Sequence, residues 1–303
     1  MGRAAMGCVA AMVLVAGLAG CGGGRDVTQA PPSPTPAAGL TQGPGSGPAP
    51  SPTPSGRLPA VVAQVSLALP GGDAYQPQAM AFDEAGRAVV LCYNGSHPEA
   101  TGSALVLVDP EQATRGPALA LPGWALGSVA VAGGRAYVAY QDGEYRQHLA
   151  AVDLGTGRLL ADVAADGLLS ADSLAAGPAG ELYALLPDRL EVRDPLTLQV
   201  TRSLPYQGQP GQRALAGDRQ QGRLYLAAGQ QLGAYRTPDL TLLWEAALPG
   251  EIRGLTVDRA GEHVYARWEA YEAIGMVAQL AALAAATGRP LAPVTAPAGT
   301  SWR

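Results

Sequence analysis

The amino-acid sequence predicts an all-β domain built from one repeated four-stranded unit. Short apolar runs of alternating character flank glycine-containing turns, as they do in β-hairpins. The turn glycines fall at positions 86, 134, 180, 222 and 261, about 40 to 48 residues apart, which is the period of a propeller blade. No long, convincing amphipathic helix interrupts the pattern. We therefore expect a β-propeller of about five four-stranded blades over residues 58–303.

The first half of each unit is a hairpin. It consists of a short alternating run, a glycine-containing turn and a second run with an aromatic residue at a fixed offset. In chain order the five copies are Met80–Val89, Val129–Tyr137, Leu174–Tyr183, Leu215–Tyr225 and Leu255–Tyr265.

The second half of each unit is another hairpin, and its turn is opened by an aspartate in four copies: Asp109, Asp153, Asp194 and Asp239. An aspartate at the start of a turn can accept the backbone N–H two residues on. Metal ligation is the alternative interpretation, but one carboxylate per blade at a turn favours the structural role. In the fifth copy Ala284 stands at this position, although Thr287-Gly288-Arg289 preserves the turn.

The ends of the repeat region leave alternatives open. The alanine-rich run Val277–Ala286 could pass as a helix, but its alignment with the copy at Leu149–Gly157 favours strand and turn. A further strand at Val62–Leu69 could pair with the last blade and close the ring, and Pro290–Val294 could take the same place. Five blades are expected, with six kept as an alternative.

The N-terminus resembles that of bacterial prolipoproteins. Arg3 precedes an apolar run from Ala4 to Leu18, which is too short to span a membrane and suits a secretory signal. Leu18-Ala19-Gly20-Cys21 matches the lipobox. The resemblance implies a signal peptide at 1–20, cleavage before Cys21, and a lipid on that cysteine which anchors the chain to a membrane outside the cytoplasm. Because Gly22 rather than aspartate follows, it also implies an outer membrane if the host has one.

Residues 21–57 are rich in proline, glycine and serine, and we expect them to form a disordered linker. The chain contains no lysine and no basic stripe, which argues against nucleic acid as a partner. Cys92 is the one cysteine of the domain, so it cannot form an internal disulfide. Its apolar surroundings in the sequence predict a buried side chain.

The repeat motifs carry a second resemblance. The patterns V-D-x-x-G before an aromatic strand and D-x-x-T-G-x before an outer strand resemble those of YVTN-type, WD40-like and quinoprotein-like propellers of bacterial surface and periplasmic proteins. The resemblance covers residues 60–298. It implies an architecture and leaves the activity open.

Candidate binding residues lie on one rim of such a propeller, in the loops that join second to third strands and in those that lead into the innermost strands. Aromatic residues beside arginine are typical of binding hot spots. Gln76, Asp172, Gln207 and Glu251 belong to the same loops. The main candidates are Asp73, Tyr75, Asn94, His97, Trp124, Asp142, Glu144, Tyr145, Arg146, Tyr206, Arg213, Arg253, Trp268, Glu269 and Tyr271.

The sequence offers little evidence of catalysis, and we predict no catalytic residue, metal or cofactor. His97, His148 and His263 lie in three different units without metal-ligand spacing. We therefore expect a noncatalytic binding or scaffold module for an envelope protein, peptide or glycan. The alternative is an extracytoplasmic enzyme, such as a hydrolase, lyase or quinone-dependent dehydrogenase, that uses the central channel.

Overall fold

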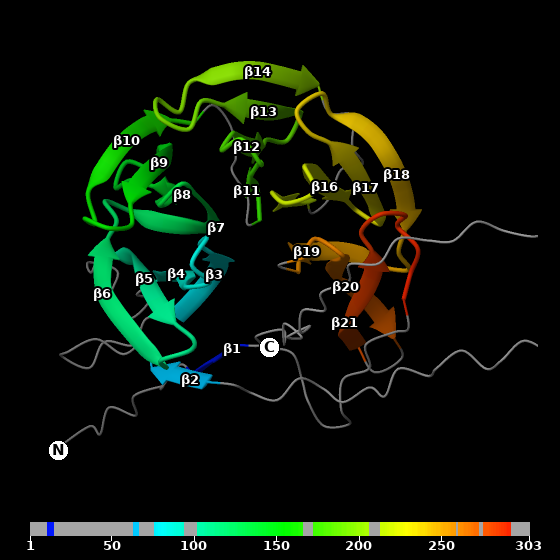
Figure 1. Cartoon of the computed structure of the whole chain (residues 1–303), viewed down its shortest axis with the longest axis horizontal. Helices are drawn as coiled ribbons and strands as arrows, with labels where there is room; N and C mark the ends of the chain where they lie inside the picture. Colours follow the sequence, from blue (N-terminus) through cyan, green and yellow to red (C-terminus); the bar gives the residue numbers. More distant parts are fainter. Residues whose placement is uncertain are drawn as a thin grey trace, which may run out of the picture.

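The computed structural model describes residues 11–14, 63–66, 76–93, 102–165, 172–205, 213–258, 260–272 and 275–291, without the side chains of 11–14, 63–66 and 270–278. Cys21 and most of the expected signal peptide and linker lie outside these ranges. The described part consists of strands and their connections (Figure 1). It contains no helix that is long and apolar enough to cross a membrane.

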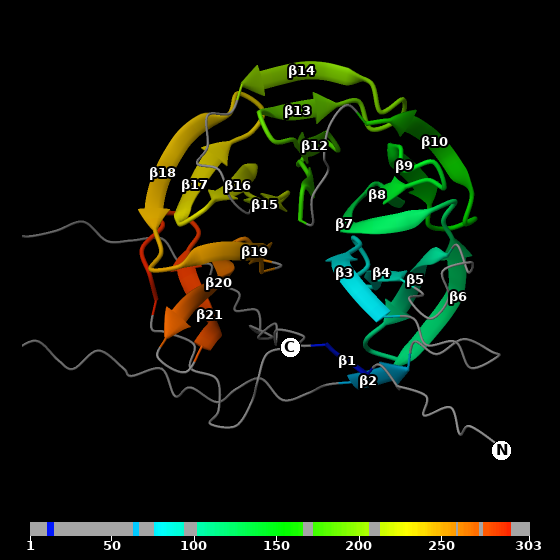
Figure 2. The same ribbon diagram turned by 180° about the vertical axis from the view of Figure 1, so that it is seen from behind.

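Five antiparallel sheets follow one another along the chain and surround a common centre, which confirms the prediction of a five-bladed β-propeller (Figures 1 and 2). Blade 1 comprises β3 (Gln76–Phe82), β4 (Ala88–Tyr93), β5 (Ser103–Asp109) and β6 (Thr114–Ala120). Blade 2 comprises β7 (Trp124–Ala132), β8 (Arg135–Gln141), β9 (Gln147–Asp153) and β10 (Leu159–Ala164). Blade 3 comprises β11 (Leu174–Ala176), β12 (Leu182–Leu185), β13 (Arg189–Arg193) and β14 (Val200–Pro205). Blade 4 comprises β15 (Arg213–Asp218), β16 (Arg223–Ala228), β17 (Gln231–Arg236) and β18 (Thr241–Ala247). Blade 5 comprises β19 (Glu251–Val257), β20 (His263–Glu272) and β21 (Gly275–Ala284).

The core lies between neighbouring blades. The innermost strands pack in sequence, β3 against β7, β7 against β11, β11 against β15 and β15 against β19. Between blades 1 and 2, for example, Val89 and Leu105 share a buried cluster with Val138 and Val152. The aromatic residues at the fixed offset in the middle three units, Tyr137, Tyr183 and Tyr225, are fully buried. Each blade therefore buries its faces against its neighbours, as a stack of repeats must.

One turn recurs after the third strand of all five blades. Its fifth residue has a positive φ in every copy, and the five residues and their φ values are Ala113 (52°), Gly157 (70°), Leu198 (61°), Leu240 (57°) and Gly288 (68°). In the last four copies the N–H of this residue donates to the carbonyl of the first turn residue at 2.8 Å. The left-handed conformation is costly for a side chain other than glycine, so the surrounding contacts must impose it.

The turn aspartates have the structural role that the sequence favours. Asp109 Oδ1 accepts the N–H of Glu111 at 2.9 Å, and Asp153 and Asp194 accept N–H groups of their own turns in the same way. In the fourth copy the alignment differs, because Arg236 opens the turn and Asp239 follows three residues later. Asp239 still accepts the N–H two residues on, at 3.3 Å.

A β-bulge recurs in the outer strands of the four complete blades. The pairing register shifts so that one residue of the third strand faces two of the fourth. The extra residues are Leu160, Thr201 and Leu243 in blades 2, 3 and 4, and blade 1 places Gly116 and Pro117 opposite Leu107. A bulge interrupts the hydrogen-bond ladder and bends the strand.

The two candidate closing strands behave differently. Within the expected segment Val62–Leu69, β2 (Ala63–Ser66) pairs with β1 (Ala11–Leu14) and not with the last blade. Pro290 instead pairs with Leu283, and Leu291 donates its N–H to Ala282, which places this stretch beside β21. The alanine-rich run forms β21 and the following turn, so the prediction of strand and turn is confirmed.

Candidate binding rim

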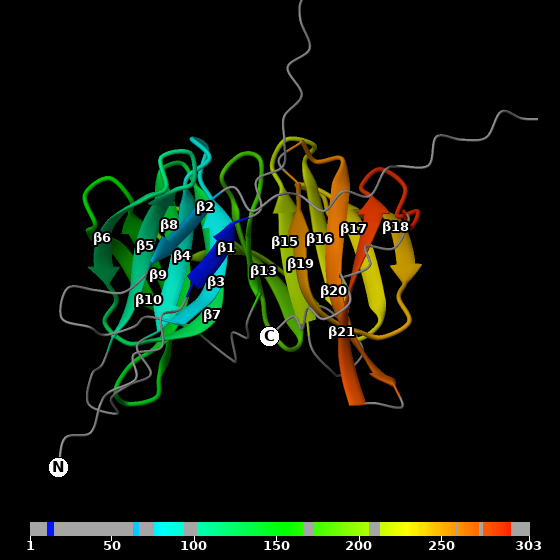
Figure 3. The same cartoon turned by 90° about the horizontal axis from the view of Figure 1, so that it is seen from below.

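The antiparallel blades give the propeller two ends, seen from the side in Figure 3. One end carries the turns between first and second strands and between third and fourth strands, and we call it the turn end. The other end carries the connections between second and third strands and those that lead into the innermost strands. We call this second end the binding rim, because the candidate residues of the sequence belong to it.

An aromatic pair lies on the binding rim of blade 2. Trp124 begins β7, and Tyr145 lies in the turn between β8 and β9. Their ring centroids are 5.7 Å apart with an interplanar angle of 52°. Tyr145 is 70% exposed and has a φ of 63°, and its carbonyl accepts the side-chain amide of Gln141 at 2.9 Å. The turn therefore holds its backbone in place while its ring faces solvent.

The charged residues beside this pair form the turn itself. Asp142 Oδ1 accepts the N–H of Glu144 and the N–H of Arg146, each at 2.9 Å, and Asp142 Oδ2 accepts the Arg146 Nε, also at 2.9 Å. The same bonds join Asp83 and Arg87 in the first turn of blade 1. Burial raises the pKa of Asp142, but the hydrogen bonds from Arg146 outweigh it and hold that pKa well below its usual range.

A histidine network extends from this turn along blade 2. The two ring nitrogens of His148 lie 3.2 Å from Asp142 Oδ2 and 3.0 Å from Asp162 Oδ1. The hydroxyl of Tyr140 donates to Asp162 Oδ2 at 2.5 Å, and the rings of Tyr140 and His148 stack at 4.9 Å. Burial and this hydrogen bond raise the pKa of Tyr140. The network fixes the base of the aromatic pair. The sequence analysis did not place Asp162 in the site.

A second charged cluster lies on blade 5. Arg253 Nη2 is 3.0 Å from Glu251 Oε2, and its Nε is 2.9 Å from Glu269 Oε2. Arg267, which the sequence analysis did not select, lies 3.5 Å from the other oxygen of Glu269. The structure therefore brings together the candidates Arg253 and Glu269 and pairs their charges with each other.

Blade 5 also requires a correction. Trp268, Glu269 and Tyr271 were expected in a loop, but they belong to β20, because the hairpin of β20 and β21 extends to Glu272. The Trp268 side chain is only 8% exposed and packs in the core between blades 4 and 5. A Cβ on Gly250 would lie 2.3 Å from its ring. Trp268 is thus a core residue.

Asp172 stands apart from these paired charges. It precedes β11 with a φ of 55°, and its backbone links two neighbouring blades, since its N–H donates to Gly127 and its carbonyl accepts from Leu215. Burial raises the pKa of its carboxyl to about 6, and Arg267 lowers it in part. A Cβ on Gly254 would lie 3.1 Å from its Oδ2.

The structure says little about the side chains of the remaining candidate binding residues. Arg213 begins β15, and Tyr271 is placed only by its backbone. Cys21, Asp73, Tyr75, Asn94, His97 and Tyr206 lie outside the described residues. Within the ranges that the structure describes, no group of three or more His, Cys, Asp or Glu side chains is arranged to hold a metal ion.

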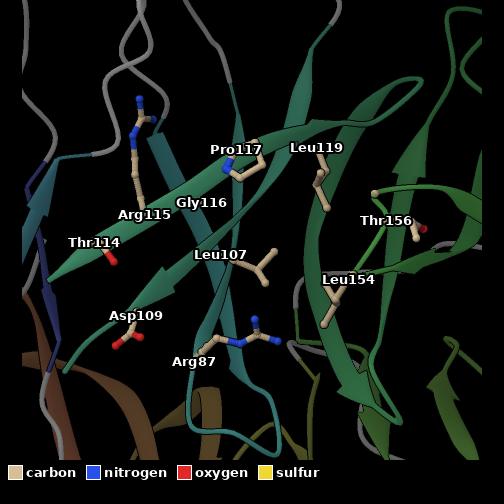
Figure 4. A pocket seen from close by; sticks show the side chains of 12 residues that line it. Arg87, Leu107, Asp109, Thr114, Arg115, Gly116, Pro117, Leu119, Leu154 and Thr156 are labelled. Carbon is tan, nitrogen blue, oxygen red and sulfur yellow. The ribbon is translucent and has the colours of Figure 1, made fainter. Parts of the chain in front are cut away.

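A groove of about 400 Å³ lies at the turn end, between blades 1 and 2 (Figure 4). Leu107, Leu119 and Leu154 form its apolar part, and Arg87 and Asp109 lie at its edge. Gly157 closes it from blade 2, where a Cβ would lie 2.6 Å from the Leu119 side chain. The sequence analysis did not anticipate this groove.

No family model matches the sequence. No curated protein matches it either. Solved structures do match, at low identity. A chain of the mitotic checkpoint complex aligns with a TM-score of 0.55 and 11% identity, over 78% of this chain and 71% of that one. Hydrazine synthase of Kuenenia stuttgartiensis aligns with a TM-score of 0.52 and 12% identity over 69% of this chain, which spans only 62% of the hydrazine synthase chain. BamB of Moraxella catarrhalis aligns with a TM-score of 0.45 and 16% identity, over 81% of this chain and 70% of the BamB chain. At such low identities, the matches to the checkpoint-complex chain and to hydrazine synthase show a shared fold alone.

Proposed function

We propose that this chain is a noncatalytic binding module, held at a membrane by lipid on Cys21, whose binding rim recognises an envelope protein, peptide or glycan. The observation that carries the proposal is the contact between the half-buried ring of Trp124 and the exposed ring of Tyr145. Tryptophan and tyrosine are enriched among the residues that dominate binding energy. They supply a large contact area with few rotatable bonds, so little side-chain freedom is lost on binding.

The surroundings of the pair support binding more than chemistry. Asp142 holds the turn of Tyr145 through Arg146, and His148 bridges Asp142 to Asp162. Each of these charges already has a partner, so a ligand need not compensate a buried charge. The pair is also fixed before a ligand arrives, which reduces the entropic cost of association.

The proposed lipid on Cys21 would set where binding takes place. Two or three acyl chains anchor a protein stably where one does not. A fully extended linker of the proposed length would have an upper reach on the order of 100 Å. Such an arrangement would place the module in the cell envelope, in an outer membrane if the host has one.

Site-specific photocrosslinking tests the binding proposal. The full chain, expressed with its own signal sequence, would carry a photoreactive amino acid at Tyr145 or, as a control, at Glu111 on the turn end. We expect a discrete crosslinked product from position 145 only, and we expect Trp124→Ala to abolish it. Absence of a product at 145, together with unchanged phenotype in Trp124→Ala and Tyr145→Ala strains, would contradict the proposal.

An extracytoplasmic enzyme that uses the central channel is the second candidate, and Asp172 is the observation that favours it. A carboxyl with a pKa of about 6 can exchange protons near neutral pH, as a general acid or base must. A panel of ester, glycoside and peptide substrates would test it. Turnover that follows a pKa near 6 and disappears in Asp172→Asn would favour the enzyme over the binding module.

A further inference from the structure

Three consecutive blades expose aliphatic side chains at the start of the outer strand or in the turn before it. Leu159 and Leu160 are each 48% exposed in blade 2, and Leu242 and Leu243 are 46% and 43% exposed in blade 4. Between them, blade 3 exposes Leu196 and Val200. These six residues, which we call the apolar arc, are six of the nine large hydrophobic side chains exposed among the described residues.

The apolar arc occupies equivalent positions in the repeat. Leu159, Val200 and Leu242 lie at or next to the start of their outer strands and face the last residues of the third strands. Leu160 and Leu243 are the extra residues of the bulges. In a regular strand, adjacent side chains point to opposite faces. The bulge therefore allows two adjacent leucines to be exposed together.

All members of the arc lie at the turn end, because each outer strand begins there. The groove between blades 1 and 2 lies at the same end, and Leu107, Leu119 and Leu154 are among the residues that line it (Figure 4). The binding rim with Trp124 and Tyr145 is at the opposite end.

The structure of the apolar arc favours some kinds of binding partner over others. Addition of a partner strand is disfavoured, because the bulges interrupt the outer edges at the same place in each blade. Two charges near the arc have partners within the protein, since Arg236 pairs with Asp239 at 3.0 Å and Asp194 accepts N–H groups of its turn. Contacts of exposed aliphatic side chains are not directional, which suits the acyl boundary of a lipid surface.

We propose that the turn end docks on the lipid surface to which the chain is anchored, through the apolar arc. The inference rests on the proposed function, because the lipid on Cys21 supplies proximity. The proposed tether would keep the domain at a high effective concentration near the membrane, which adds to the affinity that the apolar arc supplies by itself. Docking in this orientation directs Trp124 and Tyr145 away from the lipid.

The orientation is tested on the anchored chain in phosphatidylcholine vesicles. An environment-sensitive fluorophore is attached to Leu160→Cys or, as the control on the opposite end, to Tyr145→Cys. Cys92 is fully buried and should not react. We expect the probe at 160 to shift to the blue and to be quenched by spin-labelled lipid, and the probe at 145 to be quenched by iodide. Aqueous signals from both positions would overturn the proposal.

A flotation assay separates the arc from the anchor. Residues 58–303 contain all the described core clusters and lack Cys21. We expect Leu160→Ser with Leu243→Ser to lower binding to phosphatidylcholine vesicles about tenfold or more, with little dependence on salt. Met80→Ser, at an equally exposed residue outside the arc, is the matched control and should bind as the unchanged domain does.

Two results would contradict the docking proposal, and a third would contradict the proposed function instead. Equal flotation of the double variant and the unchanged domain would overturn the docking proposal. Self-association that the double variant abolishes, without vesicle binding, would also overturn it, because a second copy would then cover the arc. Failure of Cys21 to acquire lipid in cells would instead contradict the proposed function, and flotation of residues 58–303 is measured independently of it.

Discussion

Asp172→Asn should stabilise the protein at neutral pH. Burial raises the pKa of this carboxyl from 3.8 to about 6, so the folded state resists its ionisation. A difference of about two pKa units corresponds to about 3 kcal/mol of free energy. We expect about 2 kcal/mol, because the side chain keeps some contact with solvent. Asparagine has the same shape and tolerates the positive φ of 55° better than most residues.

The sign of the pH dependence follows from which state holds the proton. Below about pH 4, Asp172 is protonated in both states, and the substitution should change stability little. Between about pH 4 and 6 the unfolded state ionises while the folded state keeps its proton, so the wild type loses stability as the pH rises. Above about pH 6 the loss is complete. The advantage of Asp172→Asn should therefore grow across this window and then stay constant.

Urea denaturation of both proteins at closely spaced pH values between 3.5 and 8, followed by fluorescence, measures this difference directly (on the order of ten points suffices). Asp194→Asn is the matched control, since hydrogen bonds from Thr197 lower the pKa of that exposed carboxyl. The change in stability that Asp194→Asn causes should not grow between about pH 4 and 6. Parallel stability profiles for the wild type and Asp172→Asn would refute the reasoning.

Three further predictions concern the scaffold. Ala113→Gly should raise the free energy of unfolding by about 1 kcal/mol, because it relieves a positive φ at an exposed site. Leu198→Gly should lower the free energy of unfolding by about 3 kcal/mol, because a fully buried side chain is lost. Urea denaturation measures both changes. Gly123→Ala should lower the thermal midpoint, at a cost of about 1 to 3 kcal/mol, since its Cβ would lie 2.2 Å from the Gln141 carbonyl oxygen, and an unchanged midpoint would contradict this contact. Burial raises the pKa of Cys92 to about 12, so thiol reagents should label it at pH 8 only after denaturation, and labelling of the native protein would show that it is accessible.

The sequence contains enough information for the fold because its signals are local. Glycines such as Gly134 and Gly222 have positive φ values at the hairpin turns, and their spacing sets the blade length. Tyr137 and Tyr183 recur at a fixed offset because each fills the same place between blades. The sequence left open which of two segments lies beside the last blade, because both Val62–Leu69 and Pro290–Val294 have the character of a strand; Pro290 and Leu291 pair with β21.

The candidate rim depends on register, which the sequence does not display. His148 and Asp162 share a face only because Leu160 is an extra residue in the outer strand. Without that bulge, Asp162 would lie opposite Leu149 and point to the other side of the sheet. Trp124 and Tyr145 could be assigned to one rim from the repeat, but their separation of 5.7 Å depends on how the β8–β9 turn folds.

The recurrent turn between third and fourth strands has a consequence for how such a chain can evolve. Its backbone path is the same whether alanine, glycine or leucine occupies the left-handed position. If a blade were duplicated or deleted at this turn, the two ends of the chain would therefore join through a turn of the same conformation. Its residues can also diverge while the path is kept, which accounts for solved structures that share the fold at 11 and 12% identity.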